Sequence, residues 1–85
     1  MKLIYTQSFI RDYRKLPQHV QQTAEKQLGF LLTNFDHPSL NLKKVQGAKN
    51  IWEGRVTLSY RFTFQILEDG YLLRRIGTHD ILNNP

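Results

Sequence analysis

The stretch from Arg55 to Ile66 limits the possible fold of this chain more than any other segment. Its even-numbered residues are apolar and its odd-numbered residues are polar, without a break. Alternation with a period of two indicates a β-sheet with one buried face and one open face. Because the run is long for a single strand, we expect a hairpin near Thr57–Ser59.

Two helices are expected before this run. The first begins after Ser8, which is a suitable N-cap. Its apolar face is formed by three residues at helical spacing: Phe9, Tyr13 and Leu16. A longer amphipathic helix runs from Gln18 to Phe35, and the two helices form a hairpin. Gly29 lies inside the longer helix, where glycine costs about 1 kcal/mol relative to alanine, so we expect close packing against it.

The other elements follow from short local signals. Lys2–Tyr5 predicts a first strand, Glu68–Gly70 a tight turn, and Tyr71–Thr78 a last strand. A basic loop, Asn34–Asn50, precedes the strand-rich half. The order is therefore β-α-α-β-β-β, an α+β fold with a helical hairpin packed on one face of a small antiparallel sheet. With 85 residues, the chain is expected to form a single domain over positions 1–85.

The charge of the chain favours an anionic partner. Twelve Lys and Arg residues against seven Asp and Glu residues give a net charge of +5 and a pI near 9.8. Such a balance suits nucleic acid, an acidic protein or a membrane surface, although it also lies within the ordinary range for a soluble domain. The sequence has no cysteine, no signal peptide and no apolar run of membrane-spanning length. We therefore expect a cytoplasmic protein that does not contact a membrane.

The open face of the sheet is the candidate functional surface. Four basic side chains are expected on it: Arg55, Arg61, Arg75 and His79. The last two are placed there because Leu72 and Ile76 suit the core at the opposite parity. Arg74 would then point to the covered face and reach solvent by snorkelling.

This set of side chains suits the cleavage of RNA by its own 2′-hydroxyl. The reaction needs a base for the hydroxyl proton, an acid for the leaving 5′-oxygen, and cations that stabilise the phosphorane-like transition state. Arginine binds phosphate oxygens in pairs, and histidine exchanges protons near neutral pH. No metal or other cofactor is expected, and the sequence contains no P-loop, GxGxxG or HExxH motif.

Each candidate also has a structural interpretation. Outward arginines on a sheet are often solvated residues that limit aggregation, and His79 suits a hydrogen-bonded turn. Glu53 could be a general base or a partner in a surface ion pair. Trp52 could stack on a nucleobase, but its parity places it with the core residues. Lys43 and Lys44 suit a solvated loop beside the proposed face.

The element order, the length and two local patterns resemble the RelE/ParE superfamily of bacterial and archaeal type II toxins. The stretch Ile51–Phe64, IWEGRVTLSYRFTF, is similar to that family's central hairpin: an aromatic residue, a basic residue, then a Tyr-Arg pair before alternating apolar residues. The stretch Arg75–Leu82, RIGTHDIL, is similar to the RelE and YafQ-like branches, where Arg-x-Gly-Ser/Thr-His ends the last strand. The resemblance covers nearly the whole chain.

The resemblance implies a ribosome-dependent mRNA endoribonuclease, or interferase, that cleaves the A-site codon and is neutralised by a cognate antitoxin. By position, Arg61 matches the arginine that stabilises the transition state, His79 the histidine proposed as acid or base, and Arg75 the arginine four residues before it. The implied substrate-binding residues are Arg55, Lys43 and Lys44. The implied partners are the antitoxin, the ribosome and mRNA, with operator DNA contacted only through the antitoxin complex.

Two features keep other members of that superfamily open as alternatives. The region after the last strand, Leu82–Pro85, holds no aromatic residue of the kind that stacks on the substrate base in several family interferases. No residue is assigned as the general base. The chain could therefore be a gyrase-inhibiting toxin of the ParE type, or a catalytically inactive toxin that still binds its antitoxin.

Overall fold

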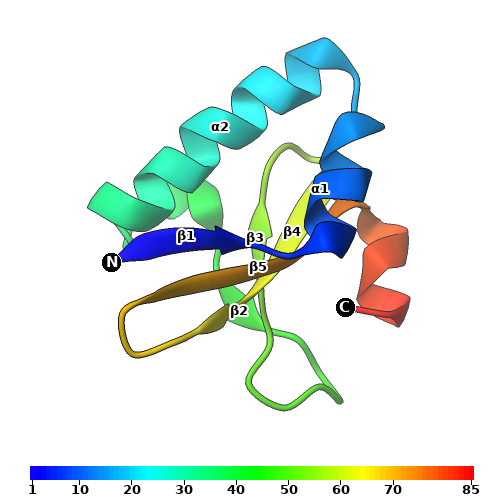
Figure 1. Cartoon of the computed structure of the whole chain (residues 1–85). Helices are drawn as coiled ribbons and strands as arrows, with labels where there is room; N and C mark the ends of the chain where they lie inside the picture. Colours follow the sequence, from blue (N-terminus) through cyan, green and yellow to red (C-terminus); the bar gives the residue numbers. More distant parts are fainter.

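The computed structural model describes residues 1–85, which form two helices packed on a five-stranded sheet (Figure 1). In chain order the elements are β1 (Lys2–Tyr5), α1 (Gln7–Arg14), α2 (Gln18–Thr33), the 3₁₀ helix η1 (Pro38–Leu40), β2 (Lys43–Lys44), β3 (Trp52–Arg55), β4 (Tyr60–Ile66), β5 (Gly70–Thr78) and the 3₁₀ helix η2 (His79–Asn83). The predicted α+β fold class, with a helical hairpin on one face of the sheet, is confirmed. The predicted hairpin between β3 and β4 and the turn before β5 are confirmed as well.

The sheet is mixed, which corrects the fully antiparallel arrangement that we expected. Its strand order is β1-β5-β4-β3-β2, and the pairs from β2 to β5 are antiparallel. The first and last strands pair in parallel, with Lys2 opposite Gly70 and Tyr5 opposite Leu73. The reason is the connection: after β1 the chain passes through both helices, and a crossover of this kind returns a strand parallel to its starting strand.

Helix α1 begins where β1 ends, and Thr6 is its N-cap instead of the predicted Ser8. The Thr6 hydroxyl accepts the backbone N–H of Phe9 at 3.1 Å and donates to the carbonyl of Leu73 at 2.9 Å. One side chain therefore caps the helix and ties it to β5. Helix α2 ends at Thr33, before the predicted Phe35, and Asn34 follows as its C-cap.

The core lies between the helices and one face of the sheet. Helix α2 crosses over the strands, and α1 packs beside β5 (Figure 1). The buried apolar cluster contains Phe9, Leu16, Val20, Ala24, Leu28, Leu31, Leu40, Val56, Phe62, Phe64, Tyr71, Leu73 and Ile76. Burying this apolar surface is the main favourable contribution to folding. Neither helix has the length and hydropathy that a transmembrane span needs.

A β-bulge in β5 changes the face on which several of its side chains lie. Thr63 pairs with Arg75 and Phe64 with Leu73, so Arg74 is an extra residue opposite β4. As a result Leu73 is fully buried in place of the predicted Leu72, which is only half-buried. Ile76 is buried as predicted.

Candidate functional site

The face of the sheet opposite the helices carries charged side chains in two cross-strand rows. The first row contains Lys43, Glu53, Thr63 and Arg75. The second row contains Arg55, Arg61 and Gly77. The predicted placement of three arginines on one face is thus confirmed. The sheet holds them at fixed spacings, because partners opposite each other lie about 5 Å apart.

Arg61 is held against the hairpin between β3 and β4. Its Nη1 donates to the carbonyl oxygens of Thr57 at 2.7 Å, Leu58 at 3.0 Å and Tyr60 at 3.1 Å. Its Nε lies 3.8 Å from Oε1 of Glu53, and the side chain is 16% exposed. Arg61 therefore caps the turn, and its Nη2 makes no hydrogen bond within the chain.

Glu53 lies between two cations and is almost completely covered. Its Oε1 is 3.9 Å from Nζ of Lys43 and 3.8 Å from Nε of Arg61, and its side chain is 8% exposed. The sequence suggested an exposed ion pair for Glu53. The ion pair is present, but the carboxylate is buried. A shallow hollow of about 340 Å³ adjoins this carboxylate, lined in part by Lys43 and Leu82.

Arg55 is half-buried beside Arg61. Its Nε is buried without a hydrogen-bond partner, while its carbonyl oxygen accepts the Nε2 amide of Gln27 at 2.9 Å. A guanidinium N–H that is buried and unpaired is costly, since it has lost its water without gaining an acceptor. Arg55 therefore keeps one enclosed, unpaired donor beneath the open face.

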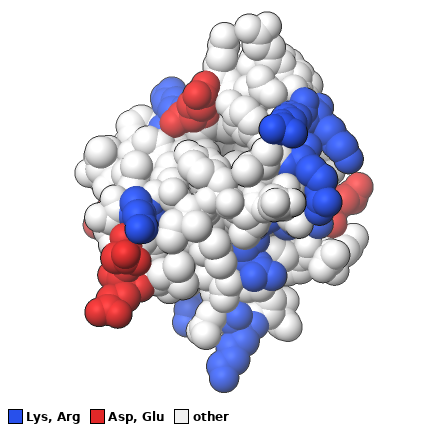
Figure 2. Space-filling view, viewed as in Figure 1, with Lys and Arg blue, Asp and Glu red and all other residues white.

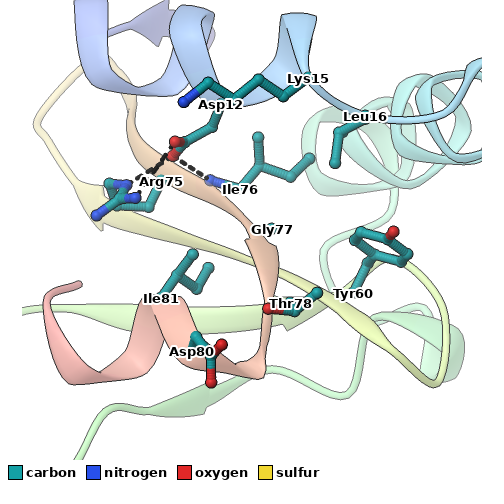
Figure 3. Close-up of a pocket in the computed structure, with 10 residues that line it drawn as sticks. All are labelled: Asp12, Lys15, Leu16, Tyr60, Arg75, Ile76, Gly77, Thr78, Asp80 and Ile81. Carbon is teal, nitrogen blue, oxygen red and sulfur yellow. Dashed lines mark hydrogen bonds and ion pairs between the residues drawn. The ribbon is translucent and has the colours of Figure 1, made fainter.

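Arg75 is bound to Asp12 of α1, a contact that sequence reasoning missed. Its Nε and Nη2 donate to the two carboxylate oxygens at 2.6 and 3.2 Å (Figure 3). The Asp12 hydrogen bond raises the pKa of Arg75 above its ordinary value, burial opposes this, and the opposite charge of Asp12 adds to it. A signal was present: Asp12 lies three residues after Phe9 and four before Leu16, on the edge of the apolar stripe of α1.

Arg74 is the second residue that sequence reasoning misplaced. Its Nη1 donates to Oε1 of Gln65 at 2.9 Å and its Nε to the main-chain oxygen of Pro85 at 3.1 Å. The bulge therefore brings Arg74 to the same side of the sheet as Arg75, and it does not snorkel from the covered face. An unbroken period of two could not reveal this.

His79 is the candidate that the fold does not bring into the arginine cluster. It is the first residue of η2, it is exposed, and its ring makes no hydrogen bond. Helix η2 folds back on the open face, where Ile81 is buried over Gly77. Through η2 the C-terminal residues therefore cover part of the face, in contact with β4 and β5.

Lys43 and Lys44 point to opposite sides of the short strand β2. Lys43 contributes to the charged row, whereas Nζ of Lys44 lies 5.6 Å from the ring centroid of Trp52. Trp52 is half-buried and stacks on Phe64 at 6.5 Å, which agrees with its predicted place beside the core. Only Lys43 of the two lysines therefore belongs to the row that contains Glu53.

A hollow of about 390 Å³ lies between α1, the free edge of β5 and η2 (Figure 3). Its charged lining residues are Asp12, Lys15, Arg75 and Asp80. Lys and Arg side chains gather over the α1 side of the molecule (Figure 2). The acidic and basic residues of the lining balance, so the excess positive charge lies on the α1 side and on the arginines of the sheet, which are suited to an extended anion.

Comparisons with known proteins give structural matches alone. No protein-family model matches the chain, and no curated protein matches it in sequence. Among solved structures, YafQ from E. coli superposes with a TM-score of 0.79 at 14% identity, over 94% of both chains. The YoeB/ParE toxin from Agrobacterium tumefaciens gives 0.78 at 16% identity, over 93% of this chain and 99% of that one.

RelE from Methanococcus jannaschii, solved in a complex with its antitoxin RelB, gives a TM-score of 0.75 at 18% identity over 95% of both chains. The three superpositions cover nearly the whole chain, while the sequences differ at most positions. The chain therefore has the RelE-like fold of the YafQ, YoeB and RelE toxins.

Proposed function

We propose that this protein is the toxin of a type II toxin–antitoxin pair and that it acts as a ribosome-dependent endoribonuclease on mRNA. The observation that carries the proposal is the pair of cross-strand rows, which place Lys43, Arg55 and Arg61 on one face of a RelE-like fold. Cations at fixed positions on a sheet are suited to the charge that develops on a phosphodiester during cleavage. The reaction takes place in the cytoplasm, where the ribosome presents the message.

In the proposed reaction the 2′-oxygen attacks the adjacent phosphorus as its proton passes to a base. The bond from phosphorus to the 5′-oxygen breaks, and an acid protonates that oxygen, leaving a 2′,3′-cyclic phosphate and a 5′-hydroxyl. Arg61 stabilises the transition state through its unpaired Nη2, and His79 serves as acid or base from its exposed position. Arg75 adds a second cation for the developing charge, and Arg55 and Lys43 bind the RNA backbone on the open face. Lys44, which lies over Trp52 on the other side of β2, would contact only RNA that continues past the edge of the sheet.

An antitoxin partner is proposed on two grounds. YafQ and RelE were each crystallised with their antitoxins, DinJ and RelB. The basic face of this chain also suits an acidic segment that folds on binding. Such a segment would place carboxylates against Arg55 and Arg61 and block the RNA.

A catalytically inactive toxin is the second candidate, and specific contacts favour it. The Nε and Nη2 of Arg75 are bound by Asp12, and the Nη1 of Arg61 is shared among three carbonyl groups. The ring of His79 meets neither arginine. A gyrase inhibitor of the ParE type is the third candidate. It is favoured by the same observation, because such a toxin does not need an acid and a base placed beside the arginines.

The deciding experiment uses purified protein, programmed ribosomes and a defined message, with cleavage mapped by primer extension. We expect cuts in the A-site codon that disappear in His79→Ala and persist in His19→Ala, a change at another exposed histidine. Arg61→Ala is expected to remove the cuts and also to weaken the hairpin, so its unfolding curve is measured alongside. The absence of cuts from folded wild-type protein would overturn the nuclease, and a supercoiling assay would then test the gyrase alternative.

A further inference from the structure

The segment Asn84–Pro85 lies on hydrogen-bond donors of the open face. Thr63 Oγ1 and Arg74 Nε both donate to the main-chain oxygen of Pro85, each at 3.1 Å. Arg75 Nη1 donates to the carbonyl oxygen of Asn84 at 3.2 Å. Three donors from two strands thus converge on two successive main-chain oxygen atoms.

The bulge makes this convergence possible. In a regular strand Arg74 and Arg75 would lie on opposite faces, but the extra residue turns both toward the open face beside Thr63. The Thr63 side chain is fully buried, so its hydroxyl is fixed in position. Two neighbouring guanidinium groups and a buried hydroxyl are a typical arrangement for binding the oxygen atoms of a phosphate.

The space beside these donors is polar and positively charged. A hollow of about 190 Å³ is lined by Thr6, Ser8, Arg74, Arg75, Asn84 and Pro85. Arg11 Nη2 donates to Oγ of Ser8 at 3.3 Å, which brings a third arginine to the margin. Asp12 balances one of the three positive charges, so the hollow keeps a positive balance.

We propose that Thr63, Arg74 and Arg75 form a phosphate subsite for single-stranded RNA, which Asn84–Pro85 occupies in the free protein and leaves when RNA binds. The inference rests on the proposed function, because it names where that RNA's backbone lies. A phosphodiester presents two anionic oxygen atoms on one phosphorus to these donors, whereas the segment presents one oxygen atom from each of two residues. Arg75 keeps its bond to Asp12 throughout, so the guanidinium stays in place.

The test measures binding of a fluorescein-labelled single-stranded RNA by anisotropy, without ribosomes and over a series of salt concentrations. Arg74→Gln is expected to weaken binding about fivefold and to reduce the salt slope by about 0.7, the value for one phosphate contact on a single strand. A variant that lacks Asn84 and Pro85 is expected to bind about fivefold more tightly than the full chain. Arg14→Gln, which removes an exposed arginine of α1 outside the hollow, is the control for net charge.

The combined variant separates the subsite from general charge effects. Arg74→Gln together with the deletion should bind no better than Arg74→Gln alone, because the gain requires the vacated arginine. Equal effects of Arg74→Gln and Arg14→Gln on the salt slope would overturn the subsite. Thr63→Val, which keeps shape and removes the hydroxyl, supplies a second variant if the deletion does not fold, and unchanged binding by it would also overturn the subsite.

Two further arms distinguish the source of the phosphate and the fate of the proposed function. Inorganic phosphate is added to the RNA binding assay at constant ionic strength. If phosphate displaces RNA while RNA binding does not depend on Arg74, the site binds free phosphate and the proposal is overturned. RNA binding that depends on Arg74, in a protein that cuts no message on ribosomes, would keep the subsite and overturn the nuclease. Cleavage of the message by a protein whose RNA binding does not depend on Arg74 would keep the nuclease and overturn the subsite.

Discussion

Asp12 of α1 and Arg75 of β5 are joined by two hydrogen bonds, from Nε to Oδ2 at 2.6 Å and from Nη2 to Oδ1 at 3.2 Å (Figure 3). Oδ2 of Asp12 also accepts the backbone N–H of Ile76 at 3.2 Å. Strand β1 pairs with β5 only as far as Leu73, so the edge of β5 beyond this residue has no partner strand. The carboxylate of Asp12 accepts the N–H of Ile76 on this open edge. One residue thus fixes α1 against β5 and holds the guanidinium of Arg75.

Asp12→Asn is expected to lower the free energy of unfolding by about 2 kcal/mol, because it leaves a largely buried guanidinium without its counter-ion. The amide oxygen can still accept the N–H of Ile76, so the fold is retained. Urea denaturation measures the change. Glu68→Gln is the matched control, since it removes one negative charge from an exposed turn. Equal losses in the two variants would show that the Asp12 pair does not stabilise the fold.

A second prediction compares the same substitution at two glycines. A Cβ at Gly54 would lie 2.4 and 2.6 Å from ring atoms of Phe62 and 3.0 Å from Leu42, whereas one at Gly29 meets nothing within 4 Å. Gly54→Ala is therefore expected to destabilise the protein by about 2 kcal/mol through overpacking. Gly29→Ala is expected to stabilise it by about 0.5–1 kcal/mol, because alanine is the better helix former.

Thermal unfolding of the two glycine variants, with urea midpoints alongside, measures these opposite signs. The close packing that we expected at Gly29 is wrong, and the close approach occurs at Gly54 on the core side of β3. Spacing alone marked Gly29 as unusual, but the ring that excludes a Cβ comes from the partner strand β4. If Gly54→Ala proved neutral, the position of Phe62 against β3 would need revision.

The sequence predicted the strands well because alternation reports burial directly. From Arg55 to Ile66 the period of two placed Phe62 and Phe64 in the core and Arg61 outside it, whereas Leu58 in the turn and Ile66 at the end of β4 are exposed. The same rule failed at Arg74, because the bulge shifts the alternation in β5 by one residue. No residue type in that stretch marks the position of a bulge. The Arg75–Asp12 bond and the packing of η2 on the sheet were missed for a different reason: both are tertiary contacts. The place of Asp12 beside the apolar stripe of α1 shows that it lies near the core, but it does not identify Arg75 of β5 as the partner.

The bulge leads to a third prediction, on neighbouring leucines. Leu73→Ala is expected to cost about 3 kcal/mol, because Leu73 is fully buried and its removal leaves a cavity. Leu72→Ala is expected to cost about 1 kcal/mol, since that side chain is half-buried on the other face. Urea midpoints at equal m-values measure both. The reverse order would place the bulge elsewhere in β5.

The last prediction concerns the alkaline limit of stability and depends on Tyr71. This ring is buried, edge-to-face with Phe64 at 5.7 Å and stacked with Phe35 at 5.8 Å. Burial raises the pKa of its phenol above the ordinary value of about 10, since the phenolate would lose its water. A raised pKa in the folded state stabilises the protein below the unfolded value, and this contribution is lost as the pH rises toward the folded value.

Wild-type protein is therefore expected to lose stability above about pH 10, and Tyr71→Phe to lose less over the same interval. The loss is reduced and not abolished, because burial raises the pKa of Tyr13 in the same direction. The measurement is the free energy of unfolding in urea at a series of pH values, with tyrosine ionisation followed by ultraviolet difference spectroscopy. Tyr5→Phe, at a half-exposed ring, is the control and should follow the wild type. Parallel curves for wild type and Tyr71→Phe would mean that the Tyr71 phenol is as well solvated in the folded protein as in the unfolded chain.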